Sequence, residues 1–250
     1  MAATASGKDK LLRHSRIYVG GYDLSGDTRT FGGFDNTFTG VDCTGLDDTV
    51  RNYLSNSRRQ TGVNGVVVMM NDTSGRSWDQ LKDTPNTSIL TVGFGGGGLP
   101  VVPDPAYLMP THQLSDVASF DSEKAILTTD FVYDSGQYDV SDANPLGVIL
   151  QGAASISATQ NGASHDNEGS TASGWHANLH VLTTASGNFA LTIEHSTDDS
   201  AWATLGTFTS TAGSVESEQL TGTGTVNQYT RFVMTRTAGT VTVVCAFARN

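Results

Sequence analysis

The sequence has little basic charge and no long apolar run, and each shortage argues against a class of protein. Its 250 residues hold 14 Lys and Arg against 25 Asp and Glu, for a net charge of −11. From Asp83 to Thr230, sixteen acidic residues accompany one base, Lys124. Such a surface repels phosphates and argues against a protein that reads or wraps DNA. No run approaches the roughly 20 apolar residues that span a bilayer, so we expect no membrane segment.

Cysteine is scarce, and the amino end lacks a secretory signal. Cys43 and Cys245 lie too far apart in sequence for a CxxC pair and form no disulfide framework, so we expect buried, reduced thiols. Residues 1–16 carry four bases and one acid without the apolar core of a signal peptide. They predict a flexible basic arm on a soluble protein that is made in the cytoplasm.

Glycine, threonine and serine are abundant, and they separate many short apolar runs. The 28 glycines supply turns, and Thr and Val suit pleated surfaces, so the composition predicts an all-β protein with minor helix. The Asn144-Pro145 pair is the best boundary signal. We therefore expect one β domain over 17–150 and a second β-sandwich, jelly-roll or immunoglobulin-like, over 151–250.

One helix is expected in the first domain, over TGLDDTVRNYL. Thr44 can cap its amino end with Asp47 three residues on, and Leu46, Val50 and Leu54 recur on one face. This face would cover a sheet or a barrel mouth of its own domain, or else bind a partner. RSWDQLKD, residues 76–83, can add one helical turn.

Two features of the first domain predict subunit contacts. Arg58 and Arg59 form the only adjacent basic pair, placed in a loop, where they could bind a neighbour's carboxylates or simply be solvated. The run over 63–72, VNGVVVMMND, predicts a strand that is buried on both faces or lies in an intersubunit sheet, with Val66 and Val68 at the contact.

A glycine run follows the strand expected over 89–94. Gly95, Gly96, Gly97 and Gly98 lack the Lys-Ser/Thr of a phosphate loop, and three prolines block the helix that such a loop needs. The run predicts a flexible projecting loop that could reach a neighbouring ring of subunits.

The second domain shows alternating strands but no convincing metal site. Strands are expected over 176–181 and 189–193, with further strands around Phe232 and over 241–247. His176 and His180 would be about 13 Å apart on one strand face, too far for one ion. His195 could join His180 across a hairpin, but two imidazoles make a weak site, so we expect solvated histidines and no metal. Acids at Asp198 and Asp199 are expected to cap their own turn.

Catalytic signatures are also missing. No GxSxG elbow accompanies the many serines. A pair of carboxylates for glycoside hydrolysis cannot be judged from spacing, although no aromatic sugar platform is visible. We expect a protein that is not an enzyme and that needs no cofactor.

The amino-acid sequences of several segments resemble those of a known group of proteins. The segment over 16–33, RIYVGGYDLSGDTRTFGG, joins an apolar strand to a glycine and aspartate turn. Together with GVILQGAASISATQNGASHDNEGSTASGWHANLHV over 147–181 and the ending TRFVMTRTAGTVTVVCAFARN, it resembles tail-tube subunits of long-tailed bacteriophages.

That resemblance implies a virion structural protein that stacks as rings, six subunits to a ring, around a channel for the genome. Residues 17–150 would line the tube by contributing strands to a shared barrel, and residues 151–250 would face outward. Its partners would be further copies, other tail proteins and DNA in transit. An acidic lining would give DNA few cations to bind. The acidic charge could equally do no more than keep a β-rich protein soluble and discourage edge-to-edge association. The alternative is a virion-surface β-sandwich that decorates the capsid or binds host glycans.

Overall fold

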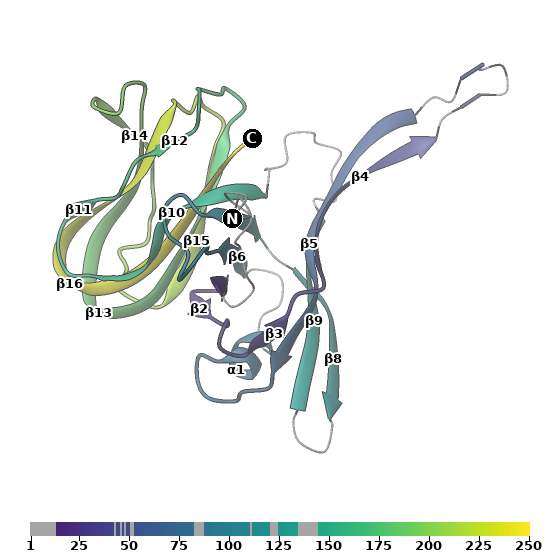
Figure 1. Cartoon of the computed structure of the whole chain (residues 1–250), viewed down its shortest axis with the longest axis horizontal. Coiled ribbons are helices and arrows are strands. Elements are labelled where there is room, and N and C mark those ends of the chain that lie inside the picture. The colour runs from purple at the N-terminus through teal and green to yellow at the C-terminus, as the bar shows by residue number, and fades with distance from the viewer. Residues whose placement is uncertain are drawn as a thin grey trace, which may run out of the picture.

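The computed structural model of the chain is built almost entirely of antiparallel strands (Figure 1). It describes residues 14–42, 44–45, 47, 49–50, 53–82, 88–110, 112–120, 125–134 and 145–250. In chain order the elements are β1 (Ser15–Val19), β2 (Tyr22–Asp23), β3 (Thr28–Thr30), β4 (Gly33–Asp42), β5 (Tyr53–Met69), α1 (Ser77–Leu81), β6 (Ile89–Phe94), β7 (Pro105–Pro110), β8 (His112–Phe120), β9 (Ala125–Asp134), β10 (Leu146–Ile156), β11 (Gln160–Asn161), β12 (His165–Asp166), β13 (Trp175–Ser196), β14 (Trp202–Thr207), β15 (Glu216–Gly222) and β16 (Tyr229–Arg249). The predicted all-β class with minor helix is confirmed.

The larger sheet has eleven strands and runs through both halves of the chain. Its main path is β14-β13-β16-β10-β7-β6-β1-β2; β11 and β12 pair with β16, and β15 pairs with β13. The 22-residue β13 and the 21-residue β16 pair along almost their whole lengths. Both curve strongly, so that the sheet folds back on itself (Figure 1).

The prediction of separate strands within β13 and within β16 is wrong, because each of these strands is continuous. The turn-like residues between the expected strands bend the pair without ending it. Ser186 and Gly239 take φ values of 57° and 80°, and the ladder passes from Ala185 opposite Thr240 to Asn188 opposite Ala238 with a register shift. Positive φ and an irregular register are the ordinary means by which a long ladder turns a corner.

The folded sheet encloses its own apolar core. Trp175 lies against Gly206 and Gly222, where an added Cβ would come within 2.5 and 2.6 Å of the indole ring. Glycine is therefore required on both neighbouring strands. The other large members of this core are Leu179, Phe189, Leu191, Ile193, Phe232, Met234, Val243, Cys245 and Phe247. Cys245 is a buried free thiol, as predicted, and burial raises its pKa; Cys43 lies outside the described residues.

The smaller sheet has five strands in the order β3-β5-β9-β8, with β4 also paired to β5. A second core joins β5 and β9 to β1, β6 and β7. Val66 and Val68 are 0% and 1% exposed in this core, so their side chains pack within the protomer, and their role at a subunit contact stays a prediction. Val67 and Met69 on the same strand are half-buried, so β5 is not buried on both faces.

The predicted boundary near residue 150 falls inside β10. This strand pairs with β7 through Leu146–Val148 and with β16 from Val148 onward, so it joins the two halves into one sheet. A third cluster of buried side chains bridges them: Tyr18, Ala106, Leu108, Ile149, Val244, Ala246 and Ala248. Sequence alternation marks strands but not the neighbours that they pair with, which is why the continuity was missed.

The helix predicted over 44–54 is wrong. Leu54 lies in β5 opposite Val41, and Val50, which should have been buried, is 68% exposed. Pairing between β4 and β5 outweighs the local helical pattern. The helical turn expected near Trp78 is confirmed as α1. Of the predicted basic arm, residues 1–13 lie outside the described residues, and β1 begins at Ser15.

Candidate assembly surface

The pair of strands β4 and β5 extends as an arm away from the rest of the chain (Figure 1). The two strands pair from Gly33 opposite Asn64 to Asp42 opposite Tyr53. On the other side of β5, β9 pairs only from Gln60 to Met69. Among the described residues, the part of β5 before Gln60 therefore pairs with β4 alone, as a two-stranded ribbon.

Long strand edges remain open on both sides of this sheet. In the described part of the chain, the ten-residue β4 pairs only with β5, and the nine-residue β8 pairs only with β9. An edge strand presents a row of backbone N–H and C=O groups that can pair with another chain. Proteins commonly recognise one another when an extended segment of one chain pairs as an added strand with the open sheet edge of another.

The arm is anchored where β4 and β5 cross the larger sheet. The Tyr107 hydroxyl accepts a hydrogen bond from the Gly62 N–H at 3.0 Å and donates one to the Gly62 carbonyl at 3.2 Å. The ring of Phe34 lies 5.2 Å from the ring of Tyr107 and 5.3 Å from that of Phe94. These contacts fix the base of the arm against β6 and β7.

Glycine permits a close approach at this base. The Gly32 N–H donates to the Asn64 carbonyl at 2.8 Å, and a Cβ on Gly32 would meet that same oxygen at 2.8 Å. Gly65 next to it has a φ of 59°, and its N–H donates to the Asp130 carboxylate at 2.6 Å. This positive φ coincides with the register shift between Val63 and Val66, where β5 bends.

Arg58 and Arg59 lie in the two-stranded part of the arm, not in a loop. Arg58 is paired with Thr39 and Arg59 with Phe38. The loop prediction was wrong because the pairing of β4 with β5 reaches further than the local turn residues indicate. Their predicted role as a subunit contact stays a prediction, now placed on a strand.

The glycine run forms a compact turn, not a long projecting loop. Gly95 is buried, its N–H donates to the His14 carbonyl at 3.2 Å, and a Cβ on it would collide with the Gly98 carbonyl. Gly97 and Gly98 are exposed with open space around them, whereas Gly96 is half-buried. Exposed apolar side chains follow at Leu99 and Val101, which are 46% and 57% exposed.

The histidines predicted to be solvated are buried between the two halves. His176 and His180 are 1% and 0% exposed. The Nδ1 atom of His180 accepts a hydrogen bond from the Gly21 N–H at 3.3 Å, and its Nε2 lies 2.9 Å from the Thr91 hydroxyl. Burial lowers the pKa of His180 to about 3, so the ring is neutral and Nε2 carries the proton that Thr91 accepts.

A neighbouring amide completes this buried polar contact. Asn178 donates to the Leu90 carbonyl at 3.0 Å and to the Thr91 hydroxyl at 3.3 Å, while its own oxygen accepts from Gln219 at 3.1 Å. Strand alternation predicted one exposed face for this part of β13. It could not reveal that β1 and β6 cover that face.

No metal chemistry is assembled within the described residues, which contain no group of three His, Cys, Asp or Glu side chains placed to hold an ion. His195 accepts from the Asn227 N–H at 3.2 Å and does not meet His180. Asp198 caps its own turn as predicted, accepting from the N–H groups of Ser200 and Ala201. These backbone hydrogen bonds hold the pKa of Asp198 well below its usual value. The helix in the described chain is too short to cross a membrane.

Sequence reasoning missed the edge strand β8 and the anchor residue Tyr107. The β8 segment, HQLSDVASF, mixes polar and apolar residues without strict alternation, so only its pairing with β9 identifies it. Tyr107 lies outside every strand that the sequence patterns predicted. An aromatic residue two positions after Pro105 was the available signal.

Comparison with known proteins gives distant structural likenesses. No family model matches the chain, and no curated protein matches it. The solved structure of the SPP1 Dit (gp 19.1) protein, titled a paradigm of hub adsorption apparatus in Gram-positive infecting phages, is 9% identical; the alignment covers 94% of this chain and 99% of that one, with a TM-score of 0.35. A chain of the phage P2 baseplate in its activated conformation with Ca is 8% identical over 94% of this chain and 98% of its own, with a TM-score of 0.30. Neither protein is described as a tail tube, and both likenesses are too distant to assign a role to this chain.

Proposed function

We propose that this chain is a non-enzymatic structural protein of a bacteriophage tail, whose five-stranded sheet joins neighbouring copies into a ring. The observation that carries the proposal is the β4–β5 arm with its open edges. A two-stranded ribbon is at best marginally stable alone in water, so an extended arm calls for a further strand. A neighbouring copy supplies one at β8, which is a long open edge of the same sheet.

The sequence resemblance to tail-tube subunits supports the same role. In that family, subunits contribute strands to one shared barrel, which removes open edges from the assembled ring. By that resemblance the ring has six copies, stacks on further rings and encloses a channel for the genome. The acidic residues from Asp83 to Asp142, in the part expected to line the tube, suit such a channel, because they give the DNA phosphates few cations to bind.

Hydrogen exchange on free and assembled protein tests this role. Backbone amides of β4, of β5 before Gln60, and of β8 are expected to exchange more slowly in the assembled form. The amides of β14, an edge of the other sheet, serve as the internal control and should keep their rates. Protection confined to β14 or to other parts of the larger sheet would refute the proposed interface.

A charge reversal on the arm gives a second test. Arg58→Glu with Arg59→Glu is expected to weaken ring assembly while leaving thermal unfolding of the protomer unchanged. Arg236→Glu is the matched control, because Arg236 is an exposed arginine of the larger sheet. If assembly of the double variant equals that of the control at several salt concentrations, the arginine pair takes no part in the contact.

A further inference from the structure

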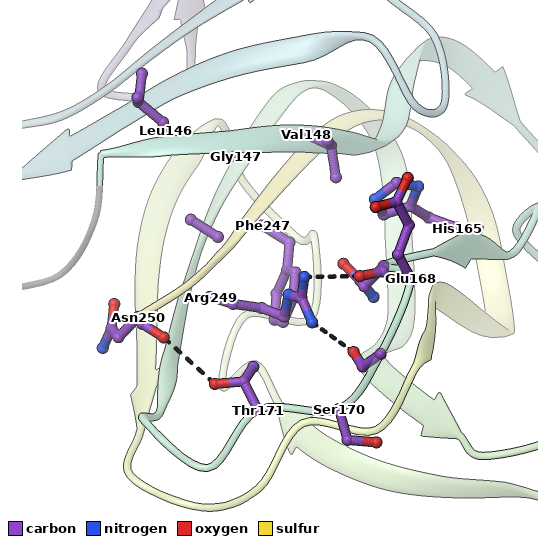
Figure 2. A pocket seen from close by; sticks show the side chains of 13 residues that line it. Leu146, Gly147, Val148, His165, Glu168, Ser170, Thr171, Phe247, Arg249 and Asn250 are labelled. Atoms are coloured by element: carbon purple, nitrogen blue, oxygen red, sulfur yellow. Dashed lines mark hydrogen bonds between the residues drawn. The ribbon is translucent and has the colours of Figure 1, made fainter.

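A pocket of about 650 Å³ lies where the start of β10, the end of β16 and the loop after β12 meet (Figure 2). This volume falls in the range of small-molecule sites. Val148 and Phe247 supply an apolar wall, and the exposed Leu146 stands at the rim. The polar lining comes from His165, Asn167, Glu168, Ser170, Thr171, Arg249 and Asn250.

Arg249 lies at the centre of this group, held in one orientation by backbone (Figure 2). One terminal nitrogen of its guanidinium donates to the Gly169 carbonyl at 2.6 Å and the other to the Asn167 carbonyl at 2.8 Å. No ion pair between described residues includes Arg249. Among these residues no carboxylate neutralises its charge, and the guanidinium has further N–H groups with which to bind a ligand.

The loop that holds Arg249 is itself firmly placed. The side-chain amide of Asn167 donates to the Gln228 carbonyl at 2.8 Å and to the Thr230 hydroxyl at 3.1 Å. On the far side of the pocket, the Thr171 hydroxyl donates to the main-chain oxygen of Asn250 at 3.4 Å. A guanidinium fixed in advance binds a carboxylate or phosphate with little loss of side-chain entropy.

The other lining groups favour hydroxyl-bearing ligands. Burial and the charge of Arg249 lower the pKa of His165, with Asp166 opposing them, so His165 is a neutral donor or acceptor near pH 7. Glu168 is exposed at the rim and accepts hydrogen bonds but repels a bare anion. Ser170 adds a hydroxyl that can donate or accept. One cation among neutral and acidic hydrogen-bonding groups suits a molecule with a single acidic group and several hydroxyls.

We propose that this pocket binds a saccharide that carries one carboxylate or phosphate group, with Arg249 binding the acidic group. The pocket lies apart from the β4–β5 arm and belongs to other elements. Saccharide binding therefore does not depend on the proposed ring. It would give the carboxy-terminal half of the chain a recognition role at the virion surface.

Calorimetric titration of the full chain tests the proposal with four probes: glucuronic acid, glucose 6-phosphate, glucose and inorganic phosphate. The two sugar acids are expected to bind at least about tenfold more tightly than glucose or inorganic phosphate, as a charge-assisted hydrogen bond to a fixed arginine allows. Absence of binding by both sugar acids at tens of millimolar would overturn the proposal, and so would equal affinity for glucose. Tighter binding of inorganic phosphate would point to a bare-anion site and also contradict it.

Variants separate the pocket from general charge effects. Arg249→Gln is expected to weaken sugar-acid binding about tenfold or more, while Arg236→Gln on the same strand leaves it unchanged. Leu146→Glu adds a negative charge at the rim on a side chain that is 57% exposed, so it should reduce binding without disturbing the fold. If Arg249→Gln does not fold, Leu146→Glu still tests whether the ligand binds in this pocket. Equal losses in the Arg236 variant, or unchanged binding in Leu146→Glu, would refute the assigned pocket.

Discussion

The two sheets of this protein differ in the length of their longest edge strands. The eleven-stranded sheet folds back on itself, and its edge strands β14, β15 and β2 have six, seven and two residues. The five-stranded sheet has the short edge strand β3 but also β4 and β8, with ten and nine residues, and its arm continues beyond the described pairing with β9. Short edges discourage pairing with other chains, whereas long open edges invite it. The difference locates self-association in the smaller sheet.

Removing the carboxy-terminal strands of the larger sheet is expected to have the largest effect. A chain that ends at residue 150 would cut β10 within its pairing to β16 and expose Tyr18, Leu108 and Ile149, which the lost strands cover. We expect this fragment to lose cooperative thermal unfolding and to aggregate. A fragment that melts cooperatively and forms rings would instead establish residues 17–150 as an independent domain, as the boundary signal at Asn144-Pro145 predicts.

A core substitution in the larger sheet should separate stability from assembly. Phe232→Ala empties a fully buried site beside Phe208 and is expected to lower the free energy of unfolding by about 3–5 kcal/mol. Chemical denaturation measures this loss. Assembly below the melting temperature should match the wild type, because Phe232 is remote from β4 and β8. Loss of assembly while the variant is still folded would contradict the assignment of self-association to the smaller sheet.

The buried histidine between the halves predicts a pH dependence of stability. The pKa of His180 is about 3 when folded and near 6.5 when unfolded, so only the unfolded chain binds this proton between those values. The contribution of His180 to the free energy of unfolding is therefore fully present above about pH 6.5. It is lost as pH drops toward 3, by up to about 1.4 kcal/mol per pH unit. His165 and His195, whose pKa values burial also lowers, act in the same direction.

His180→Gln isolates that contribution. Its unfolding free energy at pH 7 will be lower, but its slope between pH 6 and 4.5 should be shallower than that of the wild type. Denaturation curves at four or five pH values give both slopes. Parallel slopes would mean that His180 does not remain neutral in the folded protein.

The base of the arm should show a smaller effect on stability. Tyr107→Phe removes the hydroxyl that bonds both backbone groups of Gly62 and is expected to cost about 1–3 kcal/mol. It should also weaken assembly, because β5 is less firmly held where the arm begins. Thr171→Val, far from the arm, provides a matched loss of one hydroxyl and should leave the assembly constant unchanged. Equal assembly of both variants would contradict the anchoring role of Tyr107.

Local patterns in the sequence predicted the fold class and several elements. The strand over 89–94, the helical turn at Trp78 and the self-capped turn at Asp198 are confirmed, since each depends on neighbours in the chain. The helix predicted over 44–54 is wrong because spacing alone cannot reveal that Leu54 pairs with Val41. Burial of His180 was missed because the strands that cover it, β1 and β6, are more than 80 residues away in sequence.

The measurement that tests self-association most directly is light scattering on purified full-length protein across a concentration series, with negative-stain imaging of the same samples. The account predicts a mass that rises with concentration and rings with an open lumen. A protein that stays monomeric at the highest concentration, with no rings in the images, would contradict it.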